Sequence, residues 1–138
     1  MNKDTLTIET PGRGFVDMTA EVARHVTRSG FADGLCHLFI QHTSASLLIN
    51  ENADPDVLHD LETFFSGLVQ DGDPRFRHRA EGPDDMAAHI RAALTQTSLT
   101  VPVRAGRLAL GTWQAVYLWE HRHRPHRRRV LVTLLDST

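Results

Sequence analysis

The chain has 138 residues, close to the commonest size of one domain, and folding at this length buries roughly two thirds of the surface that the unfolded chain exposes. Hydrophobic residues make up 41% and charged residues 23%, which excludes an intrinsically disordered chain. The formal net charge of −2 excludes a protein that is basic overall, although five arginines gather in residues 121–129. We expect residues 1–138 to form a single domain.

The N-terminal sequence and the cysteine content bear on location. The first ten residues lack the basic start and the apolar run of a signal peptide, and no stretch approaches about 18 uncharged apolar residues. Cys36 is the single cysteine, so no disulfide can form within the chain. We therefore expect a cytoplasmic protein that neither spans nor binds a membrane.

The first third of the chain predicts strands around one helix. Residues 5–10 alternate apolar and polar side chains, as a half-buried strand does. A helix is expected at about 18–29, with apolar residues every fourth position, Asp17 at its start and Gly30 as its left-handed end. Residues 34–42 predict a buried strand closed by His42, and the apolar run 47–49 predicts a pairing strand.

Two more helices are expected in the middle of the chain. The first covers 55–69, with Asp54 as N-cap and an apolar stripe of Val57, Leu58, Leu61, Phe64, Phe65 and Leu68. After a turn at 71–74, a short extended piece carries Phe76 and His78. The third helix begins behind Asp84, with His89 on the flank of a predicted buried stripe of Met86, Ile90, Ala93 and Leu94.

The last third predicts strands alone. They are expected at 99–103, 108–110, 112–121 and 129–135, with Pro125 in the turn before the last. The strands and helices do not alternate as repeated βαβ units. We therefore predict a single-domain α+β fold with about three helices and a mainly antiparallel sheet, folded as a β-sandwich or in a jelly-roll-like manner.

Three histidines each end or border a predicted element: His42, His78 and His89. Three imidazoles that leave an open coordination position describe a catalytic zinc site, so these residues are predicted to converge on one divalent metal. The alternative is that they are ordinary histidines, hydrogen-bonded in the core or facing solvent.

Acidic and amide side chains supply further candidates. Glu51, Asn52 and Asp54 precede the helix at 55–69, where capping explains Asp54 and the functional interpretation is Mg²⁺ binding or orientation of His42. Gln114 and Glu120 share one face of the strand 112–121. Each is interpreted either as part of a satisfied polar network or, for the strand-end carboxylate, as a general base.

The arginine-rich turn at 121–129 is predicted to be a solvated hairpin end. Substitution of Arg122, Arg124, Arg127 and Arg128 is accordingly expected to leave folding and activity nearly intact. Arg129, at the start of the last strand, is the arginine expected to present a fixed guanidinium to a phosphate. Nucleic acid is not expected as a partner, because no aromatic residues interleave with these arginines.

Several motifs together resemble one family. They are H-T-S-A at 42–45, N-E-N-A-D-P-D at 50–56, His78, D-D-M-A-A-H at 84–89, S-L-T-V-P-V at 98–103 and G-T-W-Q at 111–114. In this order they are similar to the YjbQ family over almost the whole chain. The resemblance implies a β-sandwich-like domain with flanking helices, a homotrimer, and a cleft whose histidines hold a metal.

The resemblance also implies an activity, that of a secondary thiamine-phosphate synthase. Such an enzyme joins a pyrimidine methyl diphosphate to a thiazole phosphate and releases pyrophosphate. For this reaction we assign catalytic roles to His42, Glu51, Asp54, Gln114 and Glu120, and phosphate or substrate binding to Ser44, Asn52, Thr112 and Arg129. Zinc is expected at His42, His78 and His89, with magnesium as a companion of the diphosphate. The alternative is a non-catalytic trimer that binds a metal or a phosphate ligand as a sensor or scaffold.

Overall fold

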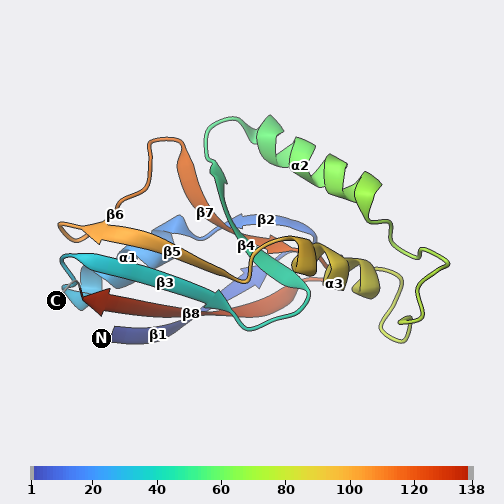
Figure 1. Cartoon of the computed structure of the whole chain (residues 1–138), viewed down its shortest axis with the longest axis horizontal. Coiled ribbons are helices and arrows are strands. Elements are labelled where there is room, and N and C mark those ends of the chain that lie inside the picture. Colours follow the sequence, from blue (N-terminus) through green and yellow to red (C-terminus); the bar gives the residue numbers. More distant parts are fainter. Residues whose placement is uncertain (1, 137–138) are drawn as a thin grey trace.

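The computed structural model describes residues 2–136, which form two antiparallel sheets and three helices (Figure 1). The five-stranded sheet has the order β1 (Asn2–Thr10), β8 (His126–Asp136), β3 (Gly34–Ile40), β5 (Ser98–Arg104) and β6 (Arg107–Leu108). The three-stranded sheet has the order β2 (Gly14–Asp17), β7 (Gln114–Glu120) and β4 (Ala45–Glu51). The predicted α+β class with three helices and antiparallel sheets is confirmed.

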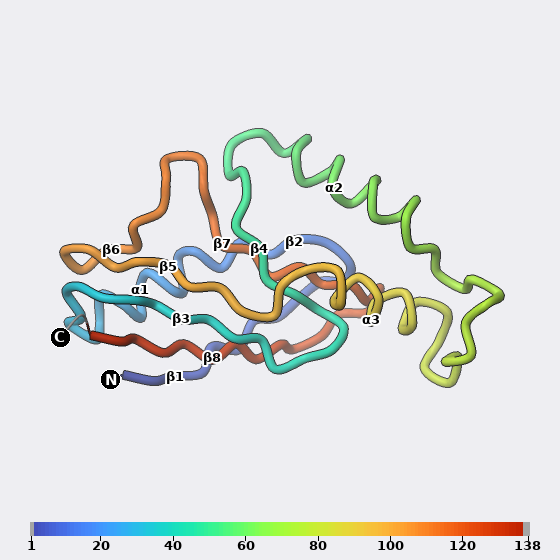
Figure 2. The backbone as a smooth tube through the Cα atoms, viewed as in Figure 1, coloured from blue at the N-terminus to red at the C-terminus, as the bar shows by residue number. Residues whose placement is uncertain are grey.

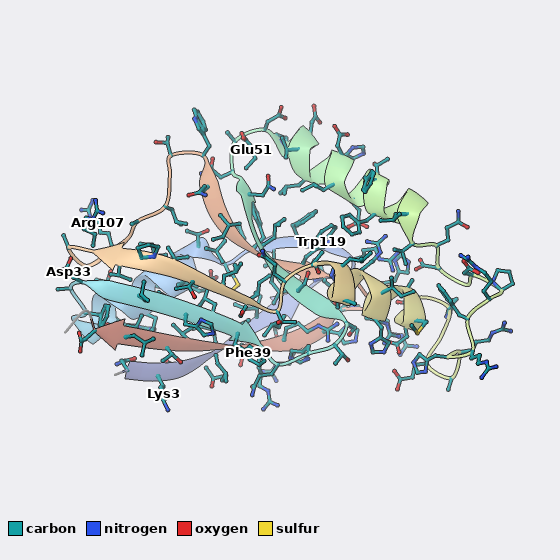
Figure 3. All side chains as sticks on the ribbon, viewed as in Figure 1. Lys3, Asp33, Phe39, Glu51, Arg107 and Trp119 are labelled. Atoms are coloured by element: carbon teal, nitrogen blue, oxygen red, sulfur yellow. The ribbon has the colours of Figure 1, made fainter. Side chains whose placement is uncertain are left out.

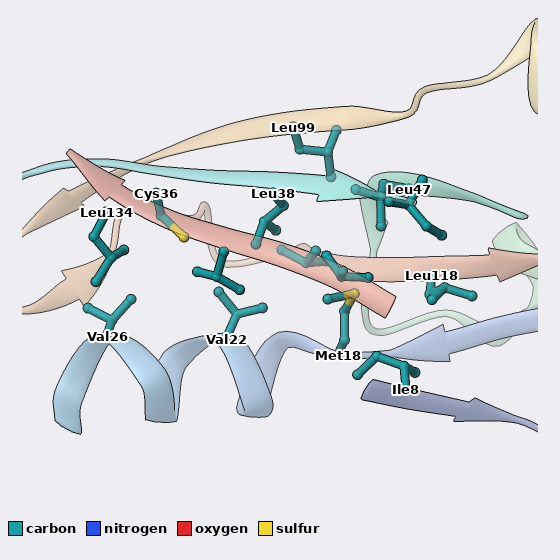
Figure 4. Packing of buried hydrophobic residues seen from close by; sticks show 14 of the residues in the cluster. Ile8, Met18, Val22, Val26, Cys36, Leu38, Leu47, Leu99, Leu118 and Leu134 are labelled. Atoms are coloured by element: carbon teal, nitrogen blue, oxygen red, sulfur yellow. The ribbon is translucent and has the colours of Figure 1, made fainter. Parts of the chain in front are cut away.

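The hydrophobic core lies between helix α1 (Thr19–Ser29) and the inner faces of both sheets (Figure 4). The oxygen Oδ1 of Asp17 accepts a hydrogen bond from the Thr19 amide at 2.9 Å, and Gly30 ends the helix at φ 70°, as predicted. Met18, Val22 and Val26 lie four residues apart, as expected, and are fully buried. These three side chains meet alternate side chains of the strands, among them Ile8, Cys36, Leu38, Ile40, Leu47, Leu118, Val130, Val132 and Leu134.

Helix α2 (Pro55–Leu68) stands away from the sheets, and the chain returns from it through a long loop to α3 (Asp85–Leu94), as the backbone trace shows (Figure 2). Asp54 caps α2 by accepting from the Asp56 amide at 2.9 Å, as predicted. The helix forms as predicted, but its apolar stripe is not buried within one chain: Phe64 is 64% and Leu68 57% exposed. The expected extended piece around Phe76 and His78 belongs to this loop and forms no strand.

The buried face of α3 differs from the predicted one. Leu94 is 57% exposed, whereas Asp85, Ala88, Arg91 and Ala92 face the interior. The physical reason is that α3 covers ion pairs: Asp85 meets Arg122, and Arg91 meets Glu62 of α2. The spacing of apolar residues along the sequence cannot identify a helix face that is buried because its charged residues form ion pairs.

Two further observations complete the fold. Strand β2, which pairs with β7, was not predicted, because its four residues carry only Phe15 and Val16 as an apolar signal. Among residues 2–136, no helix combines the length and the apolar character needed to cross a bilayer.

Candidate metal centre

Three side chains converge where the long loop enters α3. The Nε2 atom of His78 lies 2.6 Å from Oδ2 of Asp85, and Nε2 of His89 lies 3.1 Å from the same oxygen. Asp85 and His89 are four residues apart in α3 and therefore share one face of the helix. One ligand atom from each of the three residues lies within 4.8 Å of the others, so the group can hold a single ion.

Asp85 is held in place by arginine. Its second oxygen, Oδ1, accepts from Nη1 of Arg122 at 2.7 Å, and its side chain is only 2% exposed. Burial opposes ionisation, but the hydrogen bond to His78 and the positive charge of Arg122 lower the pKa of Asp85 below its usual value. Asp85 is therefore an anion at neutral pH, as a metal ligand must be.

Asp84, the residue before this ligand, fixes the same arginine. It meets Nε of Arg122 at 3.1 Å and accepts from the backbone amide of His123 at 2.9 Å. Burial raises its pKa, but these hydrogen bonds more than offset that effect and hold the pKa at about 2. Arg122 was predicted to point into solvent at a hairpin end, and that prediction is wrong.

His89 has the hydrogen bonding of a metal ligand. Its Nδ1 lies 3.0 Å from the carbonyl oxygen of Thr43, and a carbonyl can only accept, so Nδ1 carries the proton. The lone pair of the neutral ring is then on Nε2, which faces a carboxylate oxygen that also accepts. A proton or a metal cation has to lie between them. A backbone carbonyl that fixes the second ring nitrogen is the usual support for a zinc-binding histidine.

The donor set and its spacing fit zinc. Two imidazole nitrogens and one carboxylate oxygen are the ligands of many catalytic zinc sites, which keep a fourth position open. Tetrahedral ligands about 2.1 Å from zinc lie roughly 3.4 Å apart. The 3.1 Å between His89 and Asp85 is close to this spacing, and the 2.6 Å between His78 and Asp85 requires a small opening.

Of the three histidines predicted to converge, the structure brings together two, His78 and His89. The rings of His78 and His89 are 5.4 Å apart between centroids, but the third member of the group is Asp85. His42 points to another partner: its Nε2 accepts from the Arg129 amide at 2.8 Å, and its Nδ1 lies 3.3 Å from Nη1 of Arg128. Burial first, and then the charges of Arg128 and Arg129, lower the pKa of His42.

Glu120 forms a buried ion pair with Arg128 beside His42, and Ser44 contacts the arginine of this pair. Glu120 is fully buried and pairs through both oxygens with Arg128, with further hydrogen bonds from Thr10 and from the Arg122 amide. Burial raises the pKa of Glu120, but these bonds lower it overall. Arg128 also reaches the hydroxyl of Ser44 at 3.0 Å. Arg128 was predicted to be solvated, and its 5% exposed side chain contradicts that.

Five other predicted site residues lie at the opposite end of the three-stranded sheet. The register of β4 and β7 pairs Ala45 with Glu120 and Glu51 with Gln114, so the two ends are six residues, roughly 20 Å, apart. Figure 3 shows Glu51 at the upper end of β4 and Trp119 between α2 and α3. The residues at this end are Glu51, Asn52, Asp54, Thr112 and Gln114.

The side chains at this far end bond to backbone. Glu51 accepts from the Asp54 amide at 3.2 Å, and Gln114 accepts from the Gly111 amide at 2.7 Å. Asn52 donates to the carbonyl of Thr112 at 3.0 Å. Arg129, the last predicted site residue, lies instead beside His42: its side chain is exposed, and its backbone amide donates to the His42 ring. In the described chain these contacts shape turns, and they bring none of these side chains into the His78–Asp85–His89 group.

A pocket of about 380 Å³ opens beside the metal group. His78 forms part of its wall, together with the apolar side chains of Pro74, Phe76 and Pro83. Asp73 and Arg79 also line it, so it is a concave site that combines apolar walls with a few polar groups, as small-ligand sites do.

Comparisons with known proteins agree with one another. The family model described as "UPF0047 protein YjbQ-like" matches residues 4–137. UPF0047 protein sll1880 of Synechocystis is 53% identical over 131 residues, which cover 95% of this chain and 89% of that protein. UPF0047 protein YjbQ of Escherichia coli O157:H7 is 45% identical over 131 residues, 94% of each chain.

Solved structures give the same result. A crystal structure of the conserved hypothetical protein TT1486 from Thermus thermophilus superposes with a TM-score of 0.87 at 37% identity, over 96% of this chain and 99% of that one. The hypothetical protein APE1520 from Aeropyrum pernix gives a TM-score of 0.89 at 29% identity, over 99% and 100%.

Fold and site together define a small antiparallel α+β protein with a His–Asp–His group at the start of its third helix. The chain belongs to the UPF0047 family of YjbQ-like proteins. The resemblance noted in the sequence motifs is thereby confirmed.

Proposed function

We propose that the protein is a zinc-dependent enzyme that acts on small phosphorylated substrates, with the reaction of the thiamine-phosphate synthase type that the family resemblance implies. The observation that carries the metal-dependent part is the position of Nε2 of His89, which lies 3.1 Å from the Asp85 carboxylate while the Thr43 carbonyl fixes the other ring nitrogen. The choice of substrate rests on the resemblance.

In this reaction the thiazole nitrogen forms a bond to the methyl carbon of the pyrimidine, and the bond from that carbon to the diphosphate oxygen breaks. The pyrophosphate leaves with the bonding electrons. A divalent metal at the site would neutralise the charge that develops on this leaving group, with magnesium as a companion of the free diphosphate. His78, Asp85 and His89 would hold that metal.

The protein's own residues have two further tasks. Arg122 keeps Asp85 ionised and oriented, so the ligand geometry is set before the metal arrives. The pocket beside His78 offers the apolar side chains of Phe76, Pro74 and Pro83 to a flat ring. We propose that the pyrimidine occupies this pocket.

The proposal is tested by turnover. Untagged, metal-loaded protein is supplied with the pyrimidine methyl diphosphate and the thiazole phosphate, and thiamine phosphate is measured by chromatography. We expect product with the wild type and a loss of about a hundredfold or more in His89→Ala, since removing a ligand removes the electrostatic stabilisation of the leaving group. His59→Ala is the matched control, because the side chain of His59 is 76% exposed on α2.

Two results would contradict the enzyme proposal. Equal rates for wild type and His89→Ala would place the reaction elsewhere. Metal binding without product above the uncatalysed rate would instead support the alternative, a trimer that binds a metal or phosphate ligand without turnover.

A further inference from the structure

Both ring nitrogens of His42 face hydrogen-bond donors. Nε2 lies 2.8 Å from the backbone nitrogen of Arg129, and Nδ1 lies 3.3 Å from Nη1 of Arg128. A neutral imidazole has one lone pair and one N–H, so it can accept from only one of them. The backbone contact is the shorter one. It places the lone pair on Nε2 and the proton on Nδ1.

The Nδ1 proton then points at a second donor. Arg128 uses Nε and Nη2 for Glu120 and Ser44, all acceptors, whereas within residues 2–136 its Nη1 meets only the ring of His42. Burial and the neighbouring arginines lower the pKa of His42, so the ring is neutral at pH 7. Nδ1–H of His42 and an N–H of Nη1 therefore face each other across 3.3 Å, and within residues 2–136 neither has an acceptor in this contact.

We propose that Nδ1–H of His42 and Nη1 of Arg128 together bind an oxyanion, namely a phosphate group. A cation is excluded at this position, because both groups donate and one is positively charged. The exposed side chain of Arg129 adds a positive charge at the rim. Arg128 is itself held by Glu120 and Ser44, so its guanidinium is fixed before a ligand arrives. The half-buried ring of His42 leaves the site open to solvent.

The anion site adjoins the metal group through one residue. Thr43 follows His42, and its carbonyl oxygen is the acceptor that fixes His89 at 3.0 Å. The inference deepens the proposed function and rests on it for the identity of the substrate, but the anion site itself needs neither the metal nor turnover.

Titration of metal-free protein with inorganic pyrophosphate tests the inference. We expect the imidazole ¹⁵N spectrum to show His42 as the Nδ1–H tautomer, and pyrophosphate to shift its resonances while chloride at equal ionic strength does not. In isothermal titration calorimetry, His42→Leu should bind pyrophosphate about tenfold more weakly or worse, since a hydrogen bond to a charged group is lost.

His37→Leu is the matched control, because His37 contacts Thr100 on the five-stranded sheet and should leave pyrophosphate affinity unchanged. Equal affinity in wild type and His42→Leu would overturn the inference, as would an Nε2–H tautomer or resonances that pyrophosphate does not move. The spectra of the wild type decide the matter even if His42→Leu fails to fold. Because no metal is present, failure of the anion site is distinguishable from failure of the enzyme proposal.

Discussion

At the scale of single residues, one carboxylate joins three elements. Oε1 of Glu62 on α2 lies 2.6 Å from Nη1 of Arg91, whose side chain is fully buried on α3. Oε2 accepts from the indole nitrogen of Trp119 on β7 at 2.8 Å. The contact thereby links α2, which has no buried residue, to α3 and β7.

Replacement of Glu62 should therefore be costly. We expect Glu62→Ala to lower the free energy of unfolding by about 3 kcal/mol, because Arg91 would keep its charge in the interior without a partner. Urea denaturation followed by tryptophan fluorescence measures it. Glu9→Ala is the control: Glu9 and its partner Arg127 are 77% and 76% exposed, so the change should stay within about 0.5 kcal/mol. Equal effects of the two substitutions would contradict this account.

His121 makes the stability of the protein sensitive to acid. Burial, and then the charges of Arg91 and Arg13, lower its pKa from 6.5 to about 3. Between these values the unfolded chain binds the extra proton, so stability is complete above pH 6.5 and falls as the pH falls, by about 1.4 kcal/mol per pH unit. The carboxyl groups with lowered pKa, such as Asp84 at about 2, lose their contribution at lower pH.

Substitution of His121 should remove this dependence. Urea denaturation between about pH 6 and about pH 4.5 should give a slope of unfolding free energy against pH that is shallower in His121→Gln by the contribution of one proton. The slope is informative even if the variant is less stable throughout. An unchanged slope would mean that the ring titrates normally in the folded chain.

At the scale of elements, a glycine sets the approach of β3 to β8. Gly34 has φ 150°, and a Cβ built there would lie 2.0 Å from the carbonyl oxygen of Leu135. We expect Gly34→Ala to cost about 3 kcal/mol or more, since backbone has to move. At Gly30, with φ 70° and no atom within 4 Å, alanine should cost about 1–2 kcal/mol, through backbone strain alone. Thermal unfolding measures the stability of both variants. If Gly34→Ala were as stable as Gly30→Ala, the close approach of the β3 and β8 backbones at Gly34 would be refuted.

The sequence was enough to predict an element that buries apolar side chains. It was not enough where the buried side chains are charged and form ion pairs. Met18, Val22 and Val26 are four residues apart, and this spacing predicted both α1 and its buried face. The same reasoning failed for α3, whose interior face carries Asp85 and Arg91. Arg128 was predicted to be solvated because Pro125 indicated a hairpin end, and its partner Glu120 becomes visible only once β7 and β8 are folded.

The candidate site was predictable to a similar degree. His78 and His89 were identified, but Asp85 was missed although its spacing from His89 was a usable signal, since residues four apart share a helix face. His42 was placed in the same site because strand periodicity gives the face of a residue and not the direction of its ring nitrogens. Those directions depend on Arg128 and Arg129, which come from the other end of the chain.

At the scale of the whole molecule, one chain leaves much apolar surface uncovered. Leu35, Phe39 and Leu135 on the five-stranded sheet are 43%, 42% and 39% exposed, in addition to the apolar residues of α2. We propose the homotrimer that the family resemblance implies, which would cover part of this surface. Sedimentation equilibrium at micromolar concentration should give three times the chain mass of 15.5 kDa. A monomer would contradict the proposal.

The central claim is that His78, Asp85 and His89 hold one metal ion. Its most direct test is elemental analysis of untagged protein after dialysis against zinc and removal of unbound ions. We predict about one zinc per chain in the wild type and in His59→Ala, and a loss of most of it in His89→Ala and in Asp85→Asn. Wild-type protein without zinc, or a His89→Ala variant that retains the full amount, would contradict the account.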